Sequence, residues 1–420
     1  MTNDLTLQYI IKSEMKPSLG VTEPSAIALA SATAYSKIGG NIKKIEITVD
    51  QGLFKNAVIC SVPGSTEKGL KIAALLGALG GNPNAGLEVL KEIKETDDLK
   101  AKDMIAKNTV EIKVAKKPFL YVEVLVITDR GSCKAVIEDM HDRIVLIELN
   151  GKIVQEINER KKENILKDIS NYKILDLVNF VQEISFEKIE FISDAIRMNK
   201  ELAKEGLTGK WGMGAGLAMH DLMKKGVMTD DLINHAAYMV ASSLDARTGG
   251  APKPAMSIAG SGSHGCVATL PIVAISERKG IGLEKLIRAV ALSFLITIYI
   301  KRYSGRLSAF CGCAVTAATA ASAGIVFLLD GKIGQIEGSI NNMAADVTGL
   351  LCDGTNYGCA LKCATGTVSA VRSALFALEG ITIPSNSGIV GSNIEETIKN
   401  IGKISCPGMK KTDDIVVNVI

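Results

Sequence analysis

Alanine-rich helical segments, separated by short glycine-rich breaks, dominate the chain from about residue 186 to its end. The breaks read KWGMGAG, DARTGG, AGSGSHG, CGCA and CDGTNYGC. The 420-residue chain contains 40 glycines, one tryptophan and only 4% aromatic residues, so few large rings are present to fill a core. Small side chains fill an interior at normal density only where backbones approach closely. The pattern therefore predicts tightly packed helices.

Strand patterns are concentrated in the first half of the chain. Apolar and polar residues alternate in KKIEITVD, and four further strand-like segments (TVEIKV, FLYVEVLVITD, CKAVIEDM and RIVLIELNG) fall between residues 109 and 156. Short loops join these four, which favours an antiparallel meander. We predict an α+β fold with a mainly helical catalytic domain at 174–420 and a smaller α/β domain at 36–173 that contains an antiparallel sheet. The helical segment at 1–35 is expected to pack with the catalytic domain.

Charge and hydropathy exclude two classes of partner. The net charge is only +3 and the basic residues form no stripe, so nucleic acid is not an expected partner. The longest apolar run, 289–300, has about twelve residues, whereas a membrane span needs about twenty. The first twenty residues carry acids and lysines without an apolar signal core. We expect a cytoplasmic protein that acts on a small molecule.

Five of the nine cysteines fall between residues 311 and 363. In a reducing compartment, clustered thiols indicate metal ligands or catalytic groups rather than disulfides. Cys352 and Cys359 are seven residues apart, which in a continuous helix would separate them by roughly 10 Å. The glycines and asparagine of CDGTNYGC instead predict a loop, with a helix resuming near Cys359. Such a loop allows the two thiols to come together.

With Cys311 at the start of the preceding helical segment, these two cysteines make a set of three soft thiolates. Such a set suits zinc or an iron–sulfur cluster, and the spacing matches neither a zinc ribbon nor a ferredoxin. A four-iron cluster held by three cysteines leaves one iron open as a Lewis acid for a substrate thiolate or hydroxyl. Cys313 and Cys363 remain alternative ligands, since both lie near the set.

The chain resembles the L-cysteine desulfidases, which are distantly related to the α-subunits of bacterial iron–sulfur L-serine dehydratases. The resemblance runs nearly end to end and is carried by KPSLGVTEPSAIALA, LGALGGNPNAGLEVLK, GLTGKWGMGAG, DARTGGAPKPAMSIAGSGSHG, YIKRYSGRLSAFCG and LLCDGTNYGCALK. It implies a carbon–sulfur lyase with a [4Fe-4S] cluster on Cys311, Cys352 and Cys359. The implied reaction is a non-redox β-elimination that converts L-cysteine to pyruvate, ammonia and sulfide. Cys313 and Cys363 would then lie outside the ligand set.

One residue departs from the family pattern. Its members typically read G-C-T-E-P where this chain has Gly20, Val21, Thr22, Glu23 and Pro24. The missing cysteine is the natural candidate for the base that removes the substrate's Cα proton. Valine can neither donate nor accept a proton, so either another residue supplies the base or the activity is impaired.

Further candidates come from polar residues within the same motifs. Glu23 is a candidate catalytic carboxylate, with an exposed acid in the first turn of a helix as the alternative. His264 is a candidate for proton transfer, and the Ser261–Ser263 loop offers donors for a substrate carboxylate. Asp245 and Arg247 would either pair with each other or bind the substrate's amino and carboxylate groups. The remaining candidates for substrate binding are Asn82, which first suggests a turn, and the cations Arg306 and Lys362.

Two other functions remain open. An iron–sulfur L-serine dehydratase would use the same site with hydroxide as the leaving group. A non-catalytic cluster protein that senses thiols or sulfide is the alternative from another class, and Val21 favours it. A homodimer is one assembly compatible with the sequence.

Overall fold

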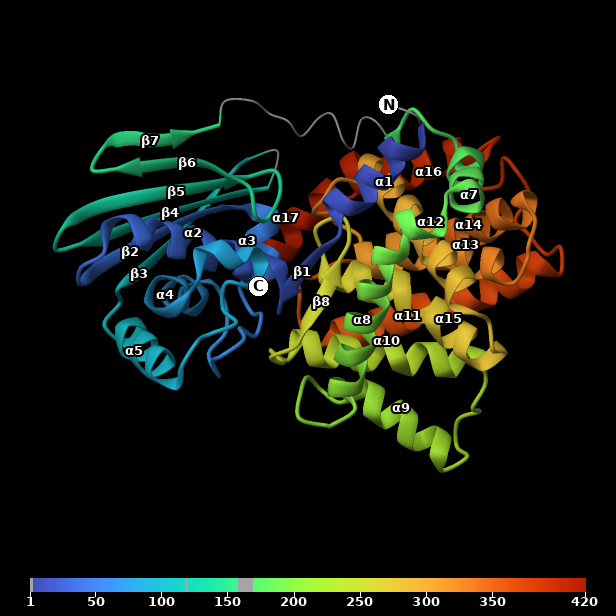
Figure 1. The fold of residues 1–420 in the computed structure, drawn as a ribbon, viewed down its shortest axis with the longest axis horizontal. Helices are drawn as coiled ribbons and strands as arrows, with labels where there is room; N and C mark the ends of the chain where they lie inside the picture. The colour runs from blue at the N-terminus through green and yellow to red at the C-terminus, as the bar shows by residue number, and fades with distance from the viewer. Residues whose placement is uncertain (1–2, 118–119, 158–168) are drawn as a thin grey trace.

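The computed structural model describes residues 3–117, 120–157 and 169–420, which form two groups of elements side by side (Figure 1). One group, the α/β unit (22–117 and 120–157), contains a six-stranded sheet with helices packed on it. The other, the helical unit (169–408 together with α1, Asn3–Glu14), is built almost entirely from helices. The predicted α+β fold is confirmed. The charged segment ERKKENILKD (159–168) lies outside the described residues.

The sheet of the α/β unit has the strand order β3-β2-β4-β5-β6-β7. Its strands are β2 (Ile42–Asp50), β3 (Val110–Ala115), β4 (Tyr121–Thr128), β5 (Gly131–Glu138), β6 (Ile144–Leu149) and β7 (Lys152–Glu156). The predicted antiparallel meander is confirmed for β4 to β6, and β7, which was not among the predicted strands, extends it. It is wrong for β3, because β2 lies between β3 and β4 and pairs parallel with β3.

Parallel neighbours require a crossover connection, and helices provide it here. The connecting elements are α3 (Gln51–Ala57), α4 (Leu70–Gly80), the 3₁₀ segment η1 (Pro83–Glu88) and α5 (Glu95–Ala106). Alternation identifies a strand and its buried face, as in Ile45, Ile47 and Val49 of β2. It does not specify the neighbouring strand, which explains the error.

The N-terminal segment is divided between the two cores. Leu7, Ile10 and Ile11 of α1 belong to the core of the helical unit. In contrast, α2 (Thr22–Ile38) packs with α4 against β4 and β5 in the core of the α/β unit. Every residue of α2 from Thr22 to Ala34 is buried, and most are small, so the helix fits closely on the sheet. The expectation that all of 1–35 would pack with the catalytic domain therefore holds for α1 and not for α2.

The helical unit surrounds a core rich in alanine. Its α-helices are α7 (Ile174–Glu183), α8 (Ser193–Gly206), α9 (Ala215–Lys224), α10 (Leu232–Thr248), α11 (Gly262–Lys279), α12 (Leu283–Ser304), α13 (Ala318–Leu328), α14 (Ile333–Val347), α15 (Gly358–Leu378) and α16 (Ile394–Lys403). Short 3₁₀ turns lie at Phe186–Lys188 and Glu190–Ile192, and π-helical segments at Cys313–Ala317 (η4) and Ile404–Gly408. Helix α10 packs against α8, α11 and α15. A Cβ added at Gly206 of α8 would lie 1.8 Å from Ser242 O of α10, which shows the predicted close approach of backbones.

A short two-stranded sheet joins the beginnings of two helices that matter for the site. Strand β1 (Lys16–Leu19), which leads into α2, pairs antiparallel with β8 (Pro254–Ser257), which leads into α11. The pairing places Glu23 and Ser261 on neighbouring segments although they are far apart in sequence. The C-terminal helix α17 (Lys410–Val419) crosses back to pack on α3.

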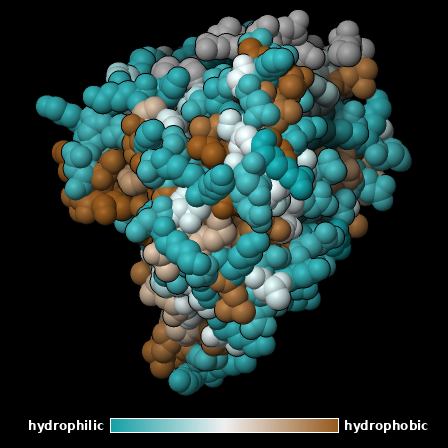
Figure 2. All heavy atoms as spheres, turned by 90° about the vertical axis from the view of Figure 1, so that its left-hand side faces the viewer, coloured by the Kyte–Doolittle hydropathy of each residue, from teal (hydrophilic) through white to brown (hydrophobic). Residues whose placement is uncertain are grey.

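The surface is largely polar. Figure 2 views the molecule from the side of the α/β unit, and hydrophilic side chains cover most of this face, with apolar ones in separate groups. Among the described residues, no helix combines the length and apolar character needed to cross a membrane.

Candidate active site

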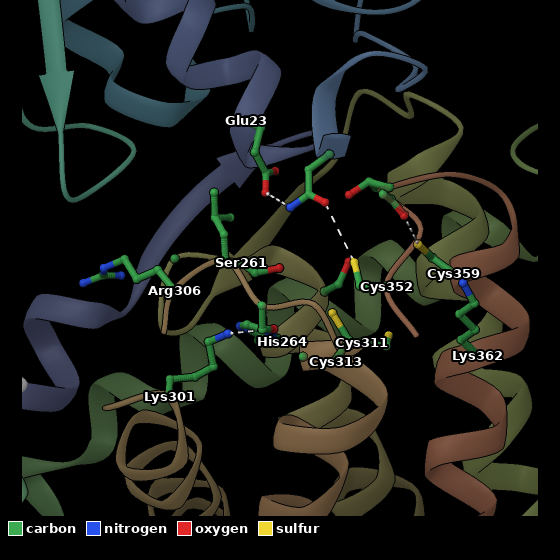
Figure 3. A pocket seen from close by; sticks show the side chains of 18 of the residues that line it. Glu23, Ser261, His264, Lys301, Arg306, Cys311, Cys313, Cys352, Cys359 and Lys362 are labelled. Atoms are coloured by element: carbon green, nitrogen blue, oxygen red, sulfur yellow. Dashed lines mark hydrogen bonds between the residues drawn. The ribbon is translucent and has the colours of Figure 1, made fainter. Parts of the chain in front are cut away.

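A cavity of about 60 Å³, partly open to solvent, is lined by residues of both units (Figure 3). The α/β unit supplies Glu23, Asn56 and His141, and the helical unit and the segments that enter its helices supply the rest. Eleven residues singled out from the sequence line this cavity: Glu23, Arg247, Ser261, Ser263, His264, Arg306, Cys311, Cys313, Cys352, Cys359 and Lys362. The fold therefore gathers most of the predicted site residues around one space.

A local backbone pairing brings Cys311 and Cys352 together. Phe310 and Leu351 form an isolated antiparallel bridge between the two segments. Cys311 N donates to Leu350 O at 2.7 Å, and Cys352 N donates to Ala309 O at 2.9 Å. This short ladder aligns two cysteines that are about forty residues apart in sequence, and both line the cavity.

Cys359 reaches the same cavity from the first turn of α15. Helix α15 begins at Gly358, so the predicted loop from Cys352, with a helix resuming near Cys359, is confirmed. Asn356 closes the loop, because its side-chain Oδ1 accepts from Gly358 N at 2.7 Å and its carbonyl accepts from Cys359 N at 3.1 Å. A turn formed by Asn is a local property, which explains why it was predictable.

Two additional cysteines contact Cys311. Cys313 lies two residues further on, in the π-helical segment η4, a feature often found at functional sites. Cys363 lies on α15, one helical turn after Cys359, and is buried. Hydrogen bonds from the thiols of Cys313 and Cys363 lower the pKa of Cys311 well below its usual range and raise their own pKa values. Cys311 is therefore favoured as a thiolate.

Burial shifts the pKa of Cys352 and Cys359 in the direction opposite to the shift of Cys311. It raises the pKa of Cys352, and it raises that of Cys359 to about 12. All nine cysteines of the chain are free. Within the described residues, no three His, Cys, Asp or Glu side chains converge as they would around a single metal ion.

Arg247 is a buried cation without a counter-ion among the described residues. It lies near the end of α10 and is 2% exposed. Nη1 donates to Ser263 Oγ at 2.6 Å, whereas Nε and Nη2 have no hydrogen-bond partner in the part of the chain that the structure describes. Ser263 lies in the first turn of α11, whose N-terminus adds a partial positive charge. This side of the cavity suits an anion such as a carboxylate.

Two predicted substrate-binding residues do not line the cavity. Asp245 neither pairs with Arg247 nor faces the site, because its carboxylate accepts from Met213 N at 3.2 Å and Gly216 N at 2.8 Å at the start of α9. Positions two apart on a helix point in different directions, and this separates the pair. Asn82 caps η1, because its Oδ1 accepts from Asn84 N at 3.0 Å, in agreement with the turn that the sequence first suggests.

Glu23 is a buried carboxylate on the opposite wall. It is 5% exposed, and its oxygens accept from Asn56 Nδ2 at 3.0 Å and Thr22 Oγ1 at 3.1 Å. Asn56 also accepts from Cys352 Sγ at 3.8 Å, so it links Glu23 to a cysteine of the site. The alternative of an exposed acid in a first helical turn is wrong.

His141 and Asn56 were missed by the sequence analysis. His141 is 3% exposed, and its Nε2 lies 3.9 Å from Glu23 Oε1. Burial lowers its pKa, opposed by the charge of Glu23. It lies in the loop between β5 and β6, and its sequence neighbours include the acids Asp139 and Asp142. No local pattern distinguishes such a loop from one covered by another unit.

His264 and Lys301 lie together at the base of the cavity. A Cβ added at Gly312 would be 2.6 Å from His264 Nε2 and 3.3 Å from Lys301 Nζ, so glycine after Cys311 leaves room for both. Burial and the positive charge of Lys301 lower the pKa of His264 well below its usual value. Burial lowers the pKa of Lys301 to about 8. Lys301 was missed, although its position directly after the long apolar run was a usable signal.

The other two predicted cations already have partners. Arg306 forms a buried bidentate pair with Glu14 at 2.6 and 3.0 Å. Lys362 pairs with Asp353 in the cysteine loop. Because both charges are compensated, Arg247 is better suited than either to bind an anionic ligand.

Val21 lies just outside the lining of the cavity. It precedes α2, is 1% exposed, and its carbonyl accepts from Ser25 N and Oγ. Glu23, which does line the cavity, follows two residues later. The position at which a cysteine was expected is therefore adjacent to the site.

Comparisons with known proteins agree with the resemblance seen in the sequence. Residues 84–418 match the family described as serine dehydratase alpha chain. A UPF0597 protein of Clostridium botulinum (strain Langeland) is 46% identical over 98% of this chain and 97% of its own. The corresponding proteins of Clostridium tetani and Caldanaerobacter subterraneus are 40% and 38% identical over nearly their full lengths. The chain belongs to the serine dehydratase alpha chain family.

Proposed function

We propose that this protein is a lyase that removes the β-substituent of a small amino acid by a non-redox elimination. The proposed substrate is L-cysteine, and the products are pyruvate, ammonia and sulfide. The cofactor would be a [4Fe-4S] cluster held by Cys311, Cys352 and Cys359. A lyase of the serine dehydratase type is what membership of the family suggests, whereas the substrate and the cluster belong to the proposal.

The observation that carries the proposal is the meeting of three cysteines at one cavity that also contains an unpaired buried guanidinium. The ladder at Phe310 and Leu351 and the turn at Asn356 direct the three thiols to the same space. Thiolates are the ligands that iron–sulfur clusters require. Each cysteine of such a set binds a different iron, so the sulfurs do not converge on one point as ligands of a single ion do. The donor set therefore fits a cluster better than a single zinc ion.

The chain's own residues have distinct tasks in this proposal. Arg247, with Ser263 and the N-terminus of α11, binds the substrate carboxylate. A cluster at the three cysteines would supply a Lewis acid for the leaving group. His264 accepts the Cα proton at Nε2, because burial and Lys301 keep the imidazole neutral and therefore able to act as a base. The cavity walls limit the access of water.

The test combines iron analysis with turnover. Anaerobically reconstituted protein should hold about four irons per chain, as the number in the proposed cluster requires. Cys311→Ala, Cys352→Ala and Cys359→Ala should each lose most of the iron, whereas Cys406→Ala, at an exposed cysteine that does not line the cavity, should keep it. Bound zinc, or iron retained by the triple variant, would refute the ligand assignment. Sulfide and pyruvate should form from L-cysteine.

L-Serine is the second candidate substrate, and the description of the matched family favours it. The same site would then release hydroxide instead of sulfide. Turnover of L-serine without turnover of L-cysteine would identify L-serine as the substrate. If the reconstituted protein reacted with neither amino acid, the enzymatic proposal would be wrong. A sensor role, which Val21 favours, would then be supported.

A further inference from the structure

The cavity contains one buried carboxylate and one buried guanidinium that have no ionic partner among the described Lys, Arg, Asp and Glu residues. Glu23 receives its two hydrogen bonds from the neutral donors Asn56 and Thr22. Within the described ranges, Arg247 contacts no carboxylate and donates only to Ser263. Burying an unpaired charge is costly, so each group is expected to meet an opposite charge in the functional state. A zwitterion satisfies both with one molecule.

His141 completes the acidic wall. Neither of its ring nitrogens has a hydrogen-bond partner among the described residues, and Nε2 lies 3.9 Å from Glu23 Oε1. A neutral imidazole offers one acceptor nitrogen, and a carboxylate offers two acceptor oxygens. Burial keeps His141 in the neutral form at neutral pH. An ammonium group has three donors and no acceptor, and it matches this set.

A glycine of the helical unit lies close to His141. Gly260, in the turn before α11, has a φ of +80°, and a Cβ there would lie 3.2 Å from His141 Nδ1. The same Cβ would be 3.0 Å from Arg306 Nη1. The loop of the α/β unit can therefore approach the helical unit closely enough to form a shared wall.

We propose that Glu23 and His141 form the subsite for the α-ammonium group of the substrate, opposite Arg247 and Ser263, which take the carboxylate. The inference rests on the proposed function, since it assumes an amino-acid substrate, and it specifies how that substrate is oriented. It also makes the α/β unit part of substrate recognition. Glu23 and His141 are then specificity-determining residues, and Asn56 and Thr22 hold Glu23 in position.

The test compares L-cysteine with 3-mercaptopropionate, which differs only by lacking the amino group. Binding to the anaerobically reconstituted protein is measured by isothermal titration calorimetry. A site built to bind a polar group rejects an analogue that lacks it, so L-cysteine should bind at least about 100-fold more tightly. Glu23→Gln and His141→Phe should each reduce this ratio at least about tenfold, leaving the dissociation constant for 3-mercaptopropionate within about twofold. The exposed Glu67→Gln serves as the control and should leave the ratio unchanged.

The outcomes separate this inference from the proposed function. If the wild-type protein binds neither ligand, the proposed function is wrong and the subsite falls with it. Equal binding of both ligands to the wild type overturns the subsite alone, and this comparison does not depend on whether a variant folds. If Glu23→Gln lowers turnover without changing the ratio, Glu23 acts on the proton and the subsite is also refuted.

Discussion

Replacing Arg247 with methionine should weaken substrate binding without weakening the fold. Nη2 and Nε carry hydrogens that no described residue accepts, so one or two charge-assisted hydrogen bonds to the substrate carboxylate would be lost. Each contributes about 1.5–3 kcal/mol, and about 1.4 kcal/mol corresponds to a tenfold change in Kd. The Kd for L-cysteine should therefore rise at least about tenfold and at most about 10⁴-fold.

Replacing a buried arginine that has an ionic partner lowers the free energy of unfolding. Replacing Arg247 should not lower it. No described residue is an ionic partner of Arg247, so methionine removes a desolvated charge at the expense of one hydrogen bond to Ser263. Replacing a buried ionic group by an apolar side chain of similar volume is often neutral or stabilising. We expect stability in the absence of substrate to be unchanged or higher.

Arg306→Met is the matched control in the same cavity. It breaks the buried pair with Glu14 and leaves a carboxylate without its partner, which should destabilise the protein by about 3–5 kcal/mol. Urea unfolding measures both stabilities, and calorimetry measures both affinities. A stability loss in Arg247→Met as large as that in Arg306→Met would show a structural role for Arg247. An unchanged Kd would refute the assignment of the carboxylate site.

Two more changes test the proton chemistry. Val21→Cys should raise sulfide release from L-cysteine at least about tenfold, because it adds a thiol at the N-terminus of α2 beside the cavity, where the helix dipole lowers a thiol pKa and a second positioned base can assist His264. Val21→Ala, which adds no thiol, should show no gain. Equal effects of the two substitutions would show that a thiol at this position takes no part in proton transfer. The free energy of unfolding of the substrate-free protein should fall as the pH drops below about 6.5, because the depressed pKa of His264 keeps it neutral in the folded state while the unfolded chain takes up a proton. In His264→Gln the slope of stability against pH between about 6.5 and 5 should decrease by up to about 1.4 kcal/mol per pH unit, and an unchanged slope would contradict the assigned burial.

Much of the local structure was predictable because it depends on short-range properties. Alternation located β2 and the strands of the meander, and the Asn and Gly residues of the Cys352–Cys359 segment correctly indicated a loop followed by a helix. The order of strands was not predictable, because β3 pairs with a strand that is distant in sequence. Strand pairing depends on which elements the connecting helices bring into register, and the alternation of one segment contains no such information.

For the site, the sequence alone determined which residues have suitable chemistry: soft thiols at Cys311, Cys352 and Cys359, and polar side chains around the start of α11. Only the tertiary structure decided which charges remain without partners. Arg306 and Arg247 are both arginines beside a glycine-rich motif, yet the fold supplies Glu14 to the first and no carboxylate to the second. His141 and Lys301 become part of the site because residues from other units and turns cover them. Burial and ion pairing arise from contacts between segments far apart in the chain, and the chemical type of a residue does not determine them.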